Sequence, residues 1–135
     1  MLVLLGLALY QYYHVERDRV DDGHNGADNT VQLAYAAQRS GVWLETSGRV
    51  IRVLRDDNEG SRHQKFILEL DDGHSVLVAH NVDLARRIPV RQGLSLTLRG
   101  RYEWNDRGGV IHWTHHDPEG REQGGWIDVD EVRYE

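Results

Sequence analysis

The sequence contains no cysteine among its 135 residues. Disulfide bonds, zinc–thiolate sites, thiol catalysis and lipidation at cysteine are therefore excluded. Positive charge is also scarce, because 16 Lys and Arg stand against 22 Asp and Glu and give a formal net charge of −6. This balance opposes non-specific binding to duplex nucleic acid, which depends on many cationic side chains that neutralise phosphates.

The sequence also lacks an apolar run long enough to span a membrane. Its longest run, residues 2–13, has about ten apolar residues, whereas a span needs roughly 20. This run fits the apolar part of an export signal, or a short anchor whose tyrosines lie at the membrane interface. A first buried helix of the domain is the alternative. We expect an exported, periplasmic or membrane-anchored protein in which only this segment contacts the membrane.

The rest of the chain divides into a linker and one domain. Residues 14–28 are polar, acidic and glycine-containing, which predicts a linker. The remaining residues, 29–135, suffice for a single core and are too few for two. At the start of this domain a helix is predicted over residues 29–40, because Asn29 can cap it and Gly41 can end it.

From Val42 onward, apolar residues recur at every second position, which is typical of strands. Five strands are predicted over residues 42–54, 63–70, 74–79, 94–105 and 109–116, and a short sixth over 126–129. Between the third and fourth strands, residues 80–89 predict a short helix that Pro89 ends. This order predicts a mainly β fold: a small five-stranded OB-like Greek-key barrel with an N-terminal helix. Another small barrel or sandwich is the alternative.

Two features of the strands bear on the barrel. Gly48 lies near the middle of the long first strand, where a bend or bulge would let that strand join both sheets. In the fifth strand, alternation places Ile111 and Trp113 on the core side. His112 and His116 then face outward, with His115 at the rim of the core.

Eight histidines are many for this length, and three of them lie between Trp104 and Pro118. If successive strands of the barrel alternate in direction, the start of the second strand and the ends of the third and fifth lie at one end. The histidines of these segments would then meet. The candidate catalytic residues are His63, His80, His115, His116 and Asp117. Candidates for substrate binding are Arg62, Lys65, Asn81, Asp83, Asn105 and Trp126. Candidate metal ligands are His112, His116 and His80.

Three chemical roles for these histidines remain open. Imidazoles beside carboxylates bind divalent transition metals, which would then be the cofactor. They also serve as general acids and bases, or as structural hydrogen-bonding groups that join strand ends. Arg62 and Lys65 either bind an anion beside His63 or form a solvated strand face. Trp126 is a candidate stacking surface.

Three stretches resemble a small bacterial family of domains of unknown function whose members usually carry an export signal. These stretches are Arg62-His63-Gln64-Lys65-Phe66, Ala79-His80-Asn81 and His112-Trp113-Thr114-His115-His116-Asp117-Pro118. The resemblance covers roughly residues 29–134. It implies export and a shared site, but no activity. One departure is Arg86, where the family pattern has proline; this loosens the end of the predicted short helix. The implied site comprises His63, His80, Asn81, Asp83, His112, His115, His116 and Asp117.

These observations support three functional hypotheses and leave open whether the protein is an enzyme. The first is an envelope hydrolase of phosphodiesters or other anionic substrates, with or without a metal. His63 and either His115 or His116 would be its acid and base, and Arg62 would stabilise developing charge. The second is a non-catalytic OB-fold module that binds a short single-stranded nucleic acid, a glycan or a peptide. The third is a metal-binding or pH-sensing structural domain.

Overall fold

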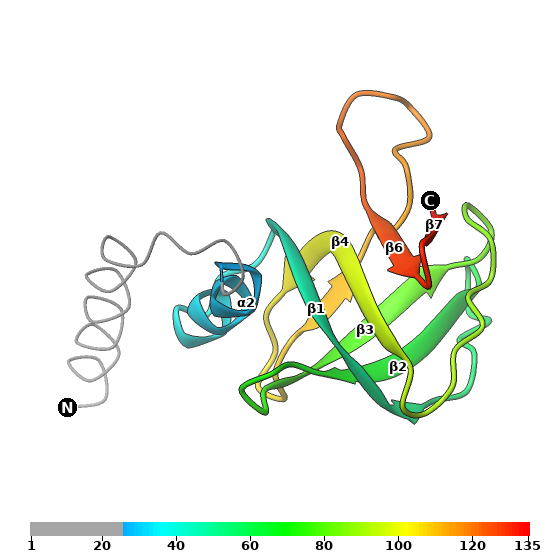
Figure 1. Ribbon diagram of the computed structural model, residues 1–135. Coiled ribbons are helices and arrows are strands. Elements are labelled where there is room, and N and C mark those ends of the chain that lie inside the picture. Colours follow the sequence, from blue (N-terminus) through cyan, green and yellow to red (C-terminus); the bar gives the residue numbers. More distant parts are fainter. Residues whose placement is uncertain (1–25) are drawn as a thin grey trace, which may run out of the picture.

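The computed structural model describes residues 26–135 (Figure 1). The predicted export segment and most of the predicted linker lie outside these residues. No helix among the described residues has the length and apolarity needed to cross a membrane. The described chain folds into one helix and a seven-stranded sheet. The elements are α2 (Gly26–Ala36), β1 (Val42–Val53), β2 (His63–Glu69), β3 (Ser75–Asn81), β4 (Ser95–Glu103), β5 (Val110–His112), β6 (Trp126–Val129) and β7 (Val132–Tyr134).

The first five strands close into a barrel. β1 pairs with β2, β2 with β3, β3 with β5, β5 with β4, and β4 returns to β1. Only the β3–β5 pair is parallel among these barrel pairs. The predicted five-stranded OB-like barrel is thus confirmed. β6 and β7 extend the sheet from β4 outside the barrel, and the sequence predicted only the first of them.

β1 reaches both sides of the barrel because it bends near Gly48. Its residues up to Arg49 pair with β4, and those from Arg49 onward pair with β2. A Cβ atom on Gly48 would lie 2.5 Å from the carbonyl oxygen of Glu69, so no side chain fits at this crossing. The register also shifts between Val50 and Arg52. The bend predicted at Gly48 is therefore confirmed.

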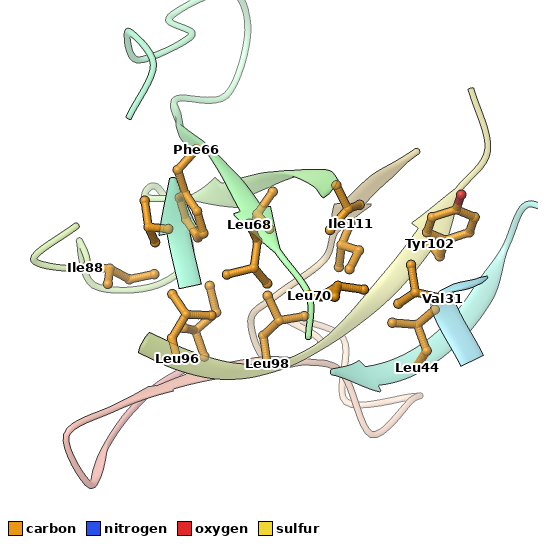
Figure 2. Packing of buried hydrophobic residues seen from close by; sticks show 14 of the residues in the cluster. Val31, Leu44, Phe66, Leu68, Leu70, Ile88, Leu96, Leu98, Tyr102 and Ile111 are labelled. Atoms are coloured by element: carbon orange, nitrogen blue, oxygen red, sulfur yellow. The ribbon is translucent and has the colours of Figure 1, made fainter. Parts of the chain in front are cut away.

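The core fills the barrel and extends to α2. Figure 2 shows Val31 of α2 beside Leu44 and Tyr102, while Leu68 and Leu98 fill the middle of the barrel. The alternation predicted for β4 holds, because Leu96, Leu98 and Tyr102 are all buried. Each fully buried Leu or Phe side chain contributes about 1.5–3 kcal/mol by leaving water, so this core accounts for most of the barrel's stability.

The short helix predicted between the third and fourth strands does not form, and that prediction was wrong. The chain makes a single turn, closed by a 3.1 Å hydrogen bond from the amide of Ala85 to the carbonyl of Asn81, and then runs irregularly to Pro89. The side chain of Gln64 explains why. Its oxygen accepts the amide of Ile88 at 2.7 Å and its nitrogen donates to the carbonyl of Ile88 at 2.9 Å. Gln64 thus occupies the amide of Ile88, which a helix over residues 80–89 would have bonded to the carbonyl of Leu84.

Candidate functional site

A cavity of about 650 Å³ opens at the end of the barrel where β2 begins and β3 and β5 end. Its walls come from segments far apart in the sequence, so the predicted convergence at one end is confirmed. The lining residues with polar or aromatic side chains include His63 of β2, Asn81 of β3, Arg101 of β4, His112 of β5, and Trp113, His115 and Asp117 of the following segment.

The segment after β5 begins at Trp113, where the backbone leaves the extended conformation of the strand. Its φ is +55°, in the left-handed region that costs a residue with a side chain roughly 1–2 kcal/mol. This conformation breaks the strand's alternation of inward-facing and outward-facing side chains, so Trp113 is 37% exposed and Thr114 is buried. The predicted core position of Trp113 was therefore wrong. Its ring instead packs on Trp43, with 5.8 Å between ring centroids, and lines the cavity.

Two glycines, Gly124 and Gly125, pack closely against the segment that follows β5. The amide of Gly125 donates to the carbonyl of His115 at 2.8 Å. A Cβ atom at Gly125 would collide with the carbonyl of Trp113, and one at Gly124 would approach the backbone of His115 and Asp117 within 3 Å. The close approach of the two chain segments thus requires glycine, and it fixes where His115 and Trp113 stand.

His63 and His115 are oriented in the same way. The Nδ1 atom of His63 lies 2.9 Å from the carbonyl oxygen of Ser61, and that of His115 lies 2.7 Å from the carbonyl oxygen of His116. A carbonyl only accepts hydrogen bonds, so each Nδ1 carries a hydrogen and donates it. The Nε2 atom of each ring then remains for a ligand. Neither Nε2 has a hydrogen-bond partner within residues 26–135.

Burial sets the charge of His115. The side chain is almost fully buried, and this desolvation is the main cause that lowers its pKa below the ordinary value of 6.5. The neighbouring rings of His116, His63 and His112 lower it further, against the opposing effect of the hydrogen bond to His116. His115 is therefore neutral at pH 7 and presents a basic Nε2.

Arg101 is one of the two arginines that line the cavity, the other being Arg121. It pairs with His112 across the β4–β5 register, and its Nε lies 3.3 Å from Oε1 of Glu103, which is also 3.3 Å from Nε2 of His112. The Nε atom is buried and lacks a hydrogen-bond partner within the described residues. The side chain as a whole is 40% exposed and lines the cavity, so its other guanidinium nitrogens can donate to an anionic ligand.

His80 occupies a different environment from the other histidines. It is completely buried, its Nδ1 lies 2.8 Å from Oγ1 of Thr114, and its Nε2 lies 2.9 Å from the carbonyl oxygen of Arg86. Burial is the main cause that lowers its pKa. Both ring nitrogens are thus used to tie the end of β3 to two other segments. This geometry suits a structural role, not the catalytic or metal-binding role expected from the sequence.

Asp117 and His116 also differ from their expected roles. The carboxylate of Asp117 accepts the amides of Glu119, Arg121 and Glu122 at 2.9–3.0 Å. These bonds, chiefly those from Glu119 and Glu122, hold its pKa below the usual value. Asp117 therefore shapes its own loop and does not orient a histidine. His116 orients His115 through its main-chain carbonyl, while its own side chain is exposed outside the cavity lining.

The three candidate metal ligands do not meet. His80 uses both nitrogens internally, His112 faces Glu103, and His116 is exposed. Within residues 26–135 no group of three or more His, Asp or Glu side chains is arranged to hold a metal ion. The metal centre predicted from His112, His116 and His80 was therefore wrong.

Arg62, Asp83 and Asn81 form the rim of the cavity. Nε of Arg62 lies 3.0 Å from Oδ1 of Asp83, and the main-chain amide of Arg62 donates to Oδ2 at 2.8 Å. The main-chain bond is the first cause, and the guanidinium the second, that lower the pKa of Asp83. Asn81 accepts the amide of Asp83 at 2.9 Å. Of the three, only Asn81 lines the cavity.

The other predicted substrate-binding residues lie away from the cavity. Lys65 stands on the outer side of β2. Asn105 lies at the opposite end of β5, where its side chain accepts the amide of Gly109 at 2.8 Å. Trp126 is covered by the guanidinium of Arg133, 4.0 Å from its ring centroid. Instead, Arg101 and Trp113 line the cavity, and sequence reasoning missed both.

The chain matches, over residues 20–135, the family described as "Protein of unknown function (DUF3465)". No curated protein matches it. Because the match covers most of the sequence, the protein belongs to this family, and the resemblance to a family of unknown function is confirmed.

Proposed function

We propose that the protein is a hydrolase of phosphodiesters or similar anionic esters, with His63 and His115 as its acid–base pair. One observation carries the proposal. Two imidazoles from separate segments line one cavity, and a main-chain carbonyl orients each so that Nε2 remains for a ligand. Paired acid and base groups of this kind typically accelerate a reaction by about 10²–10⁴-fold.

In this proposal each group has a separate role. The neutral His115 takes the proton from the attacking water or hydroxyl through Nε2, while the new P–O bond forms. When protonated, His63 donates its Nε2 hydrogen to the leaving oxygen as the old P–O bond breaks. The guanidinium of Arg101 stabilises the charge that develops on the phosphoryl oxygens. No step of the proposal uses a metal.

The acidic side chains around the cavity are compatible with an anionic substrate. Asp117 already accepts three amides. Glu119 is paired with Arg121 at 3.2 Å. These two carboxylates are thus engaged within the loop, while Glu122 also lines the cavity and, with the net charge of −6, disfavours a long polyanion.

The test is turnover of bis(4-nitrophenyl) phosphate and of a short single-stranded oligoribonucleotide by the full chain, with EDTA present. We expect His63→Ala and His115→Ala each to lower kcat by about 10²-fold or more. The wild-type kcat/KM should fall on the acid side with an apparent pKa below 6.5, because burial lowers the pKa of His115.

The matched control is His74→Gln at the far end of the barrel, where the amide can still donate to the carbonyl of Gly108. This variant should turn over substrate at the wild-type rate. Absence of turnover on every phosphodiester, or full turnover by His115→Ala, would sink the proposal. Saturable binding without turnover would support instead the second candidate, a non-catalytic OB-fold binding module, which the exposed Trp113 at the cavity favours.

A further inference from the structure

We infer that the ligand of this cavity is a short single-stranded nucleic acid, and that Trp113 is the platform on which one of its bases stacks. The inference rests on the proposed function and specifies the substrate class of the same site. It is carried by one exposed tryptophan, one arginine whose Nε lacks a hydrogen bond among the described residues, and the cavity that both side chains line.

Trp113 has the position and support that a stacking platform needs. A left-handed backbone conformation turns it out of the core to the cavity wall, where it is 37% exposed. Trp43 packs against it at 5.8 Å between centroids with 60° between the ring planes, so the ring has a fixed aromatic neighbour. Backbone strain of this kind at a ligand cavity points to function, and base stacking on tryptophan does not depend on base identity.

Arg101 supplies the group that a phosphate needs beside the stacked base. Its guanidinium carbon lies 6.0 Å from the centroid of the Trp113 ring. Its Nε is buried without a hydrogen-bond partner within residues 26–135. The Arg101 side chain as a whole is 40% exposed, so a terminal nitrogen of its guanidinium can donate to a phosphate oxygen next to a base on Trp113. His63 and His115 line the same cavity.

This combination favours a short nucleic acid over a glycan. A neutral sugar also stacks on tryptophan, but it offers no anion to Arg101. The cavity of about 650 Å³ lies within the usual range for small ligands, roughly 300–1,000 Å³. The net charge of −6 opposes a long polyanion. The ligand that fits these constraints is an oligonucleotide of a few residues.

Trp126 provides a matched control. It lies on β6 outside the cavity lining, and the guanidinium of Arg133 stacks on its ring at 4.0 Å. An effect specific to the base-stacking platform should therefore appear at Trp113 and not at Trp126.

The test measures equilibrium binding of a single-stranded RNA tetranucleotide, and of the same backbone with abasic residues, to the full chain carrying His115→Gln to prevent turnover. We expect the bases to strengthen binding about tenfold or more, a gain that Trp113→Ala removes. Trp113→Phe should keep most of the affinity, and Trp126→Ala all of it. Circular dichroism spectra should match across the variants.

The outcomes separate this inference from the proposed function. Equal binding of the abasic and base-bearing backbones, or unchanged binding by Trp113→Ala, would overturn the inference, while histidine-dependent turnover would still support the hydrolase. Base-dependent binding with no turnover by the wild-type chain would contradict the hydrolase and leave the stacking site standing. Binding of chitotetraose in place of RNA, lost in Trp113→Ala, would overturn the nucleic-acid assignment.

Discussion

Each end of the barrel contains histidine rings that hydrogen-bond to main-chain carbonyls, which makes the two ends comparable. At the end where α2 packs, Nε2 of His74 lies 2.9 Å from the carbonyl oxygen of Gly108, and the hydroxyl of Tyr102 donates to the same oxygen at 3.0 Å. At the cavity end, His63 and His115 also donate to main-chain carbonyls, but through Nδ1.

The ends differ in what surrounds those rings. His74 packs edge-on against Tyr35 of α2, at 4.9 Å between ring centroids, beside the apolar core. At the cavity end the partly buried His63 and the almost fully buried His115 line a cavity, and neither Nε2 has a hydrogen-bond partner among the described residues. A histidine–carbonyl hydrogen bond is thus part of the packing under the covering helix, whereas under the proposed function it orients an acid–base group at the cavity. Substitutions at the two ends should accordingly affect different properties.

The largest effect should come from removing the aromatic ring of Tyr102. This side chain is completely buried, so Tyr102→Ala should lower the free energy of unfolding by about 3–5 kcal/mol. Tyr102→Phe removes only the hydroxyl and should cost about 1 kcal/mol. Burial raises the pKa of Tyr102 to about 12, so the hydroxyl remains a donor throughout the neutral range. Urea denaturation measures each change.

Truncation of Trp113 to alanine at the cavity end is the comparison matched to Tyr102→Ala. Trp113→Ala should change the free energy of unfolding by less than about 1 kcal/mol, because the ring is already partly in water. If Trp113→Ala destabilises the protein as much as Tyr102→Ala does, Trp113 is a structural residue. The distinction between the two ends would then fail.

Much of the fold and the location of the site could be predicted from local pattern. A period of two assigns side chains to faces, so Leu96, Leu98 and Tyr102 could be placed in the core from the sequence. Strand order and direction then placed His63 and His115 at one end. These inferences succeed because alternation and connectivity are properties of the chain itself.

The wrong predictions concern segments whose conformation depends on contacts with residues that are distant in the sequence. The side chain of Gln64 binds the main chain of Ile88, and residues 80–89 therefore do not become a helix. The left-handed conformation at Trp113 depends on the close approach of Gly125. The sequence around Trp113 does not indicate this contact. Likewise, His80 looks like any other histidine until Thr114 and Arg86 occupy both its nitrogens.

An intermediate effect should appear as the pH falls. The folded pKa values of His80 and His115 lie below the ordinary 6.5, so the unfolded chain binds more protons as the pH falls through 6.5. Stability is therefore complete at neutral pH and decreases below it, by at most about 1.4 kcal/mol per pH unit for each histidine. Urea denaturation between pH 7.5 and 5 measures this slope.

A variant of His80 shows how much of this pH dependence of stability comes from its imidazole. His80→Gln cannot titrate, so its unfolding free energy should vary less steeply with pH, whatever its absolute stability. The carboxylates with lowered pKa values, such as Asp83 and Asp117, lose their contribution only as the pH falls through about 3.8. They do not affect this range. An unchanged slope in His80→Gln would show that burial of this ring does not set the pH response.

The smallest effect should come from Arg62, which the sequence suggested as the charge-stabilising group. The side chains of Arg62 and Asp83 are 62% and 39% exposed, and such ion pairs contribute about 0–1 kcal/mol. Arg62 also stands outside the cavity lining, whereas Arg101 lies within it. Arg62→Ala should therefore leave kcat/KM on a phosphodiester within about twofold, while Arg101→Ala lowers it by about 10²-fold, as loss of a charge-stabilising donor does. Equal losses of kcat/KM in the two variants would show that Arg62 contributes to the reaction as much as Arg101 does. Arg62 would then have to be counted among the groups of the proposed site.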